Sequence, residues 1–307
     1  GRQRWRDMRY DYIIIGSGSA GGMIAARLSE DPAISVLLLE AGEREGHWTI
    51  RMPAATRQNF LGGPRNWCFS TEPEPFMDGR RIFQPRGKVI GGSSSLNGMV
   101  YVRGHRQDFD SWQAGGAAGW GYDDVLPHFR WLETYLPGGD ARRGDSGPIS
   151  VDRLRDHHAI QTAFLEALAE AGLGSAVDYN GAEQEGGTAL DGNIARGERS
   201  GTAALIGRIW HRRNLTILTG AHVTGLAMNG TTVTGVSFLA GGETRAAHCD
   251  REVVLSAGAV QSPQILMLSG IGPAAQLREH GITVRQDLAG VGENLHDHLE
   301  VLSLIHI

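Results

Sequence analysis

Residues 10–42, YDYIIIGSGSAGGMIAARLSEDPAISVLLLEAG, predict a strand, a glycine turn, a helix and a second strand in direct succession. Residues 12–15 form a short apolar run rich in β-branched side chains, which is typical of a strand buried on both faces. A helix is expected to start near Ser19 and to stop at Asp31-Pro32, because proline cannot continue it. Residues 35–39 form a second apolar run. This order of elements predicts a β-α-β unit with parallel strands.

The predicted turn carries the glycine pattern G-x-G-x-x-G. Gly16 permits a tight turn, Gly18 leaves room for a pyrophosphate near the backbone, and Gly21 lets the helix pack closely on the strand. The helix N-terminus favours an anion, because its first N–H groups lack backbone acceptors and the helix dipole is positive there. We therefore expect a dinucleotide site, against the alternative of a purely structural turn, formed by Gly16, Ser17, Gly18, Ser19, Ala20 and Gly21.

Glu40 ends the second predicted strand, about 20 residues after the glycines, where an acidic side chain can accept hydrogen bonds from both ribose hydroxyls of an adenosine. A glycine pattern alone is weak evidence for a nucleotide. Here the strand, the helix and the terminal carboxylate accompany it, so the dinucleotide hypothesis is considerably more specific.

The composition indicates a globular protein. The chain has 307 residues, of which 41% are hydrophobic, so it is long enough for one large or two ordinary domains. A net charge of -5 and the lack of a basic stripe argue against nucleic acid as a partner. Cys68 and Cys249 stand far apart and outside any C-x-x-C motif, so we expect neither a disulfide framework nor a zinc site.

The ends of the sequence carry expectations of their own. We expect residues 1–7 to be upstream of a natural start at Met8, and residues 302–307, LSLIHI, to be an artefactual tail that resembles a translated adaptor of a sequencing library. The chain would then be a fragment that covers residues 8–301. No long apolar window and no secretory signal is apparent, so we expect a cytoplasmic protein, with peripheral contact to the inner membrane left open.

Residues 86–103, RGKVIGGSSSLNGMVYVR, form a second stretch with ligand-binding chemistry. Gly91 and Gly92 let the backbone approach a ligand, the three serine hydroxyls that follow can bond to phosphate or ring heteroatoms, and Asn97 can contact a ligand directly. The alternative is a serine-rich loop followed by a strand, and the residues alone do not decide between the two.

The rest of the chain predicts mostly scaffold. Residues 157–173 predict a helix whose apolar stripe, Ile160, Ala163, Phe164, Ala167, Leu168 and Ala171, is a packing face. Asn229-Gly230 predicts a hairpin turn inside a β-meander. A helix is expected to open at Ser262-Pro263 after a buried strand. Further strands are expected at residues 215–218, 223–226, 232–239 and 252–256.

Together these segments resemble the glucose–methanol–choline (GMC) flavoprotein oxidoreductases over residues 8–301, and within that family the bacterial choline dehydrogenases. Residues 86–103 are similar to the first signature of the family, and residues 258–272, GAVQSPQILMLSGIG, to the second. The stretches RNWCFSTEPEPFMDGRR and GVGENLHDHLE carry the choline-type likeness. The resemblance implies an α/β fold, a doubly wound Rossmann-like FAD-binding domain with part of a second α+β substrate-binding domain. The implied boundaries are roughly 8–153 and 203–295 for the first domain, and 154–202 and 296–301 for the second.

The cofactor implied by the resemblance is FAD. It places Glu40 and Ala41 near the adenosine, residues 16–21 on the pyrophosphate, and the backbone of Val223 at the adenine. Some relatives attach FAD through a histidine where this chain has Leu96, so we expect non-covalent binding. The residues implied along the flavin are Gly92, Ser93, Asn97, Gly98, Met99 and Val100.

The implied reaction is oxidation of a primary alcohol to an aldehyde by hydride transfer to the flavin, with choline as the leading substrate. The histidine base of the family belongs to a later segment, so we expect no catalytic residue in this chain and no activity of the chain alone. His296 and His298 are assigned neither as bases nor as metal ligands, and no metal site is expected. Glu300 matches a carboxylate that faces the trimethylammonium group of choline, although a surface glutamate is the alternative.

Three other hypotheses stay open. The substrate can be another sugar-like or aliphatic alcohol, because related enzymes share the serine-rich signature. The chain can be an FAD-binding module without turnover. An NAD-dependent enzyme is disfavoured, because the two later signatures have no place in it. The electron acceptor, oxygen or a quinone, is not predicted by any motif.

Overall fold

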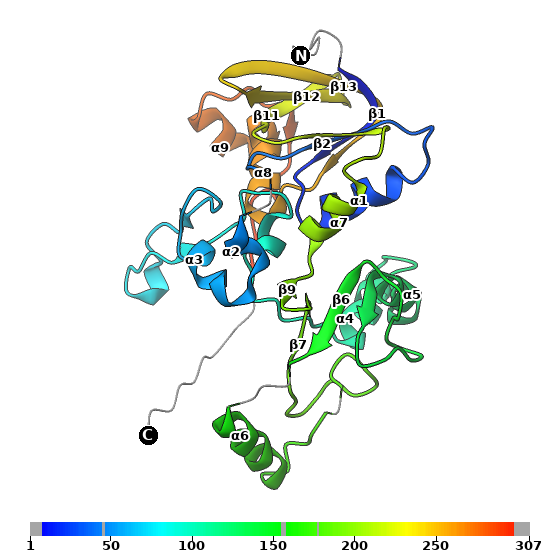
Figure 1. Cartoon of the computed structure of the whole chain (residues 1–307). Coiled ribbons are helices and arrows are strands. Elements are labelled where there is room, and N and C mark those ends of the chain that lie inside the picture. The colour runs from blue at the N-terminus through cyan, green and yellow to red at the C-terminus, as the bar shows by residue number, and fades with distance from the viewer. Residues whose placement is uncertain (1–7, 45–46, 155–157, 177, 298–307) are drawn as a thin grey trace. The chain divides into compact units, whose positions relative to one another are not determined.

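A computed structural model describes residues 8–44, 47–154, 158–176 and 178–297 (Figure 1). The chain divides into two compact units. The first consists of Gly1–Ala41 and Arg213–Ile307, and the second of Gly42–Arg212. Residues 42–153 and 203–212, which were expected in the FAD-binding domain, thus lie in the second unit. The division into functional domains stays a prediction.

The first unit is built on a mixed sheet, in which the described residues contribute six strands in the order β10-β2-β1-β13-β12-β11. The first four are parallel, and β12 is antiparallel to both of its neighbours. The predicted apolar runs lie at its centre, since every residue of β2 is buried and Ile13, Ile14 and Ile15 are buried in β1. The strands are β1 (Arg9–Ile15), β2 (Val36–Leu39), β10 (Leu215–Leu218), β11 (His222–Asn229), β12 (Thr232–Ala240) and β13 (Glu243–Leu255).

Strand β13 belongs to two kinds of pairing. Its N-terminal half pairs antiparallel with β12, and its C-terminal half pairs parallel with β1. His248 takes part in both, opposite Gly235 on one side and Arg9 on the other. The strand expected at residues 252–256 is therefore the end of a much longer one, which Figure 1 shows running from β12 to β1.

The helices of this unit are α1 (Ser19–Leu28), α8 (Gly258–Leu268) and α9 (Ala274–Glu279), together with the short strands β14 (Ile271–Gly272) and β15 (Gln286–Asp287). Helix α1 packs on β1 and β2, and α8 packs on β11. The predicted start of α8 at Ser262-Pro263 is wrong. The helix begins at Gly258, whose φ of +88° turns the chain directly out of β13, and Pro263 lies inside it.

The second unit contains smaller sheets and short helices. A three-stranded sheet joins β5 (Glu133–Tyr135), β6 (Ile149–Arg153) and β7 (Asp191–Gly192). Two hairpins pair β3 (Phe69–Ser70) with β4 (Phe83–Gln84), and β8 (Ile194–Ala195) with β9 (Glu198–Arg199). The helices are α2 (Trp48–Arg51), α3 (Thr56–Phe60), α4 (Arg106–Ala114), α5 (Tyr122–Leu132), α6 (Ala159–Glu170) and α7 (Thr202–Ile209), with 3-10 turns η1 (Pro53–Ala55), η2 (Pro75–Met77) and η3 (Gly92–Ser95).

Ion pairs, rather than apolar side chains alone, hold the three-stranded sheet. Glu133 lies fully buried between Arg103 and Arg143, and Arg143 also binds Asp178 and Asp191. These carboxylates raise the pKa of the Arg143 guanidinium further above its usual value, against the opposing effect of burial. A buried charge is tolerated only when it is paired in this way.

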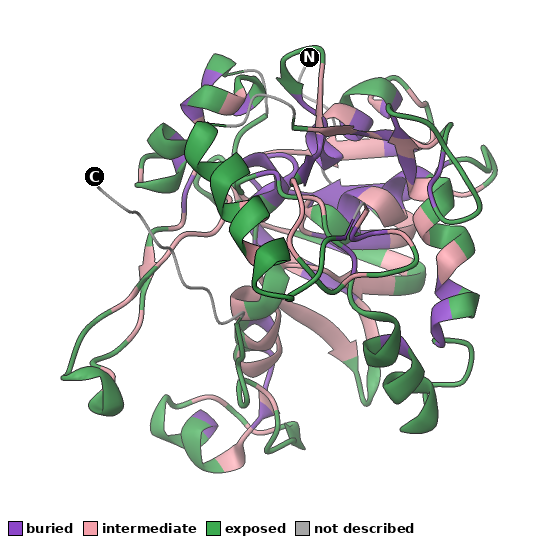
Figure 2. Cartoon of the chain, turned by 90° about the horizontal axis from the view of Figure 1, so that it is seen from below, coloured by how far each residue is buried: buried purple, intermediate pink, exposed green. Residues whose placement is uncertain are grey.

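The expectation that the apolar stripe of α6 is a packing face is wrong for the described structure, because α6 has no buried residue and Phe164 is 60% exposed. In Figure 2 buried residues, in purple, gather mainly in the strands, and outward-facing helical residues are green. His158 caps the helix through its side chain. The helix itself was predicted correctly, but periodicity identifies a face without saying what covers it.

Candidate cofactor site

Two glycines of the turn after β1 are required by their surroundings. Gly16 has a φ of +91°, and a Cβ there would lie 2.6 Å from the carbonyl oxygen of Ser256. A Cβ on Gly21 would lie 1.9 Å from the carbonyl oxygen of Gly16. Any larger residue at position 21 would force α1 away from the end of β1. The close approach expected from the glycine pattern is therefore present.

The N-terminus of α1 fits an anion. Its N-cap, Gly18, provides no side-chain hydrogen bond, and its first turn contains no acidic residue. Ser19 and Ala20 are exposed. The first N–H groups of the helix thus have no side-chain cap from Gly18 and meet no repelling carboxylate in the first turn, as a phosphate ligand requires.

Glu40 is joined to the glycine turn by hydrogen bonds. Its Oε2 accepts a bond of 3.1 Å from the backbone N–H of Ser17 and one of 2.5 Å from the Ser17 hydroxyl. Its backbone carbonyl accepts from the N–H of Ala221. Glu40 is only 5% exposed, and its carboxylate is therefore held in one orientation at the C-terminal edge of the parallel strands. Ala41 follows it directly, and Val223 packs in the core of the sheet.

The serine-rich stretch belongs to the second unit and is described by itself. Ser94 and Ser95 are buried in η3, and their hydroxyls donate to the carbonyl oxygens of Gly91 and Ile90, at 2.7 and 2.8 Å. The expectation that all three serine hydroxyls can bond to a ligand is wrong for these two, because each already donates its proton to its own loop. Ser93 is exposed, and its oxygen accepts from the N–H of Gly87 at 3.1 Å.

Beyond η3 the chain presents Asn97, Gly98 and Val100 at the surface, whereas Met99 is buried. Met99 has a φ of +63°, which is strained for a residue with a side chain. Its backbone is held from two sides, because its N–H donates to Asn97 Oδ1 and its carbonyl accepts from Asn193. The short stretch from Asn97 to Val100 is thus a fixed rim and not a loose loop.

Leu96 and Arg199 complete the surroundings of this rim. Leu96 is buried against Ile50 and Val89, in an apolar cluster. Arg199 donates hydrogen bonds to the carbonyl oxygens of Ser94 and Asn97, and burial lowers the pKa of its guanidinium to about 10. Arg199 was not selected from the sequence, because a single arginine in a polar stretch carries no local pattern.

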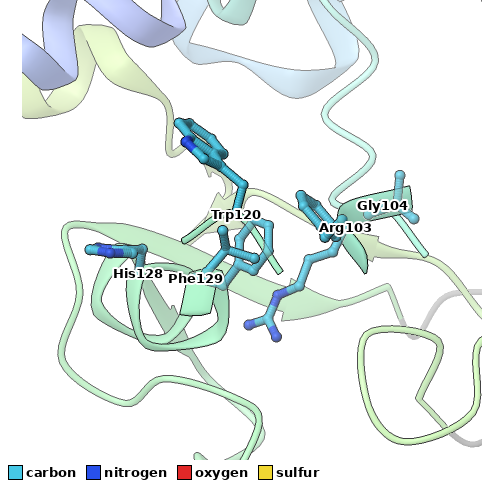
Figure 3. Close-up of a pocket in the computed structure, with 8 residues that line it drawn as sticks. Arg103, Gly104, Trp120, His128 and Phe129 are labelled. Carbon is cyan, nitrogen blue, oxygen red and sulfur yellow. The ribbon is translucent and has the colours of Figure 1, made fainter. Parts of the chain in front are cut away.

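A separate pocket of about 630 Å³ lies in the second unit (Figure 3). Its wall is mainly aromatic and aliphatic, so it offers little to a charged ligand. None of its residues was predicted to bind the cofactor. The residues that line it are Val102, Arg103, Gly104, Phe109, Trp120, Val125, His128 and Phe129.

A family model described as GMC oxidoreductase matches residues 10–300. The chain belongs to the GMC oxidoreductase family. It is 45% identical over 300 residues to human mitochondrial choline dehydrogenase. That alignment covers 95% of this chain and 50% of the human protein. It is also 46% identical over 295 residues to the oxygen-dependent choline dehydrogenase of Brucella anthropi, in an alignment that covers 96% of this chain and 54% of that protein. The chain therefore spans about half the length of these relatives.

Solved structures of similar fold agree with this membership. Pyridoxine 4-oxidase from Mesorbium loti superposes with a TM-score of 0.87 at 38% identity, over 91% of this chain and 55% of that one. A variant of Aspergillus oryzae formate oxidase, described in terms of FAD modification, gives a TM-score of 0.87 at 33% identity, over 95% of this chain and 53% of that one. The predicted family and the predicted doubly wound α/β fold class are confirmed.

The histidines and the glutamate considered near the end of the chain lie outside the described residues or at the surface. Glu300 and His298 lie outside the described residues. His296 is exposed. The described part of the chain contains no group of three His, Cys, Asp or Glu side chains that could hold a metal ion, and both cysteines are free. Within the described ranges, no helix has the length and apolar character needed to span a membrane.

Proposed function

We propose that this chain is the FAD-binding portion of a flavoprotein that oxidises choline to betaine aldehyde. The observation that carries the proposal is the Glu40 carboxylate fixed beside the uncapped glycine turn, in a GMC chain 45% identical to a choline dehydrogenase. FAD, when bound, would accept the hydride that leaves the alcohol carbon. The chain's own part is to bind and orient that group.

The proposed contacts fall in separate stretches of the chain. The amide groups from Gly16 to Gly21, Ser17, Gly18, Ser19 and Ala20 included, hold the pyrophosphate. Glu40 accepts hydrogen bonds from the ribose, with Ala41 beside it, and the backbone of Val223 meets the adenine. The residues proposed to line the flavin are Gly92, Ser93, Asn97, Gly98, Met99 and Val100.

FAD is proposed to bind without a covalent link. Leu96 occupies the position where some relatives carry a histidine, and a buried leucine has no nucleophile to offer. Acid precipitation of the FAD-loaded protein should release all of the flavin into the supernatant. Flavin retained in the pellet would contradict this part of the proposal.

For the substrate, we propose that Glu300 pairs with the trimethylammonium group of choline, because a carboxylate in a partly desolvated pocket selects a fixed cation. No catalytic base is proposed in this chain; by this proposal the base belongs to the half of the relatives' length that the chain does not span, and the chain alone does not turn over. The name of the Brucella relative supports oxygen as an electron acceptor. A cytoplasmic location, with or without peripheral membrane contact, is part of the same proposal.

The test uses a full-length protein that contains this sequence. Under anaerobic conditions choline should bleach the flavin, and Glu300→Gln should raise KM for choline by about tenfold or more, while KM for the neutral carbon isostere of choline changes little. Equal effects on the two substrates would remove choline selectivity from the proposal and favour another alcohol. Bound flavin with no bleaching by any alcohol would favour the alternative of a binding module without turnover.

A further inference from the structure

Arg199 is a buried cation whose hydrogen bonds all go to neutral groups. It is 7% exposed. Its Nε donates to the carbonyl oxygen of Ile50 at 3.1 Å, and its Nη2 donates to the hydroxyl of Thr56 at 2.8 Å. Its Nη1 donates to the carbonyl oxygens of Ser94 and Asn97, at 3.1 and 2.9 Å, and to Asn97 Oδ1 at 2.7 Å. Among the described residues no carboxylate pairs with it.

Short helices take the place of the missing counter-ion. Ile50 belongs to the last turn of α2, and Ser94 and Asn97 lie at and just past the end of η3. Carbonyl oxygens at a helix C-terminus carry partial negative charge, which stabilises a nearby cation. The planar guanidinium donates from three separate nitrogens to acceptors on different segments, a spread that the single ammonium nitrogen of a lysine cannot match. The site is therefore specific for arginine.

The contact with Asn97 has a further consequence. Asn97 Oδ1 accepts from Arg199 and also from the N–H of Met99 at 3.2 Å, so the oxygen end of this amide is committed to the protein. Asn97 is exposed, and its Nδ2 has no hydrogen-bond acceptor among the residues that the structure describes. If the amide were rotated by half a turn, its Nδ2 donor would face the Arg199 and Met99 N–H donors, and both hydrogen bonds would be lost. Asn97 thus presents only N–H groups outward.

We infer that Arg199 is a positioning residue that holds Asn97 as a hydrogen-bond donor, and that the rim therefore selects a hydrogen-bond acceptor, such as a carbonyl oxygen or an unprotonated ring nitrogen, in the bound group. The inference rests on the proposed function, in which that group is the isoalloxazine ring of FAD. Arg199 acts through Asn97 and does not itself touch the cofactor.

A double-mutant cycle measured by FAD titration of this chain tests the coupling. Arg199→Met and Asn97→Ala should each weaken FAD binding by about tenfold, since each removes the oriented donor. The double variant should bind no more weakly than Asn97→Ala alone. Arg51→Met is the matched control. Arg51 is an exposed arginine of α2 that pairs with Glu198, the residue before Arg199 in the chain, and this variant should bind FAD as the wild type does. Multiplicative effects in the double variant would overturn the inference.

Asn97→Asp separates donor chemistry from structural support. The new carboxylate would pair with the Arg199 guanidinium, so the variant should fold with undiminished thermal stability. It should nevertheless lose FAD affinity by at least about tenfold, because a carboxylate presents no donor to the ligand. Wild-type affinity in Asn97→Asp would overturn the inference, and this holds even if Arg199→Met does not fold.

A measurement without cofactor separates failure of this inference from failure of the proposed function. In hydrogen exchange of the chain alone, the Met99 amide should lose protection in Asn97→Ala and in Arg199→Met, but not in Arg51→Met. Unchanged protection in Arg199→Met would overturn the inference. If the wild-type chain binds no FAD while the exchange pattern is as expected, the proposed cofactor fails and the positioning role of Arg199 stands.

Discussion

Single residues decide whether the turn after β1 can form. The Cβ that alanine would add at position 21 has no room beside the Gly16 carbonyl, whereas Gly290 has no neighbouring atom within 4 Å of its own missing Cβ. The two positions give a matched pair, since both lie in the first unit and neither has a positive φ.

Gly21→Ala should destabilise the protein by about 1–3 kcal/mol or more, because overpacking forces backbone to move. Gly290→Ala should stay within about 0.5 kcal/mol of the wild type. Urea unfolding of both variants measures the difference. A Gly21→Ala variant as stable as Gly290→Ala would mean that α1 does not need the close approach to β1.

Residue-scale chemistry also limits what a sequence can reveal. The strand, turn, helix and Glu40 were predicted, because each carries a pattern within about 20 residues of the next. Ser94 and Ser95 were assigned possible ligand contacts, because a sequence shows a hydroxyl group but not the carbonyl oxygen to which that group donates in the folded chain. Arg199 was missed for the same reason: its partners lie more than 100 residues earlier in the chain.

At the scale of elements, the sheet β5-β6-β7 depends on the buried carboxylate of Glu133. It accepts from both Arg103 and Arg143, and from the backbone N–H of Gly144. Neutralising it leaves two arginines, each almost fully buried, without this partner.

Glu133→Gln should therefore destabilise the second unit by about 3–5 kcal/mol, the usual cost of breaking one side of a buried pair. Glu72→Gln is the control, because Glu72 pairs with Arg81 on the surface and is worth about 0–1 kcal/mol. Denaturant unfolding followed by tryptophan fluorescence compares them. A stable Glu133→Gln variant would show that the remaining acids can serve both arginines.

The same network predicts an alkaline transition. Burial raises the pKa of the Tyr101 and Tyr179 hydroxyls from 10.0 to about 12. A raised folded-state pKa gives stability that is complete below pH 10 and is lost as the pH rises from 10 to 12, because the unfolded state releases these protons first. Phenolate absorbance should show these two tyrosines titrating later than exposed ones. Tyr101→Phe with Tyr179→Phe should reduce the late phase to the contribution of Tyr135, whose pKa burial also raises.

The extent of β13 and the burial of α6 are the element-scale features that were predicted incorrectly from the sequence. The N-terminal half of β13 is mostly polar and exposed, with Ala247 as its buried residue, so only the apolar C-terminal end was recognised. The stripe on α6 correctly predicted a helix and wrongly predicted a buried face, because hydrophobic periodicity reports which residues share a side and not whether another element lies against it.

For the whole molecule, the proposed cofactor makes a prediction about stability. A ligand that binds only the folded state stabilises it by mass action, by about 2.7 kcal/mol when its free concentration is 100 times its Kd. Addition of FAD should therefore raise Tm progressively with concentration, whereas NAD should leave Tm unchanged. The reverse order of effects would restore the NAD-dependent alternative.

The pairing of β1 with β13 also sets the order in which the molecule can be made. Arg9 and Asp250, which hydrogen-bond to each other, are 241 residues apart in the chain. A ribosome that adds about 5–20 residues per second leaves the first strand without this neighbour for a time on the order of tens of seconds. During that time an apolar strand edge, rich in isoleucine, has to be kept from pairing with other chains. Supply of a chaperone during synthesis, more than the final stability of the fold, is therefore expected to limit the yield of soluble protein.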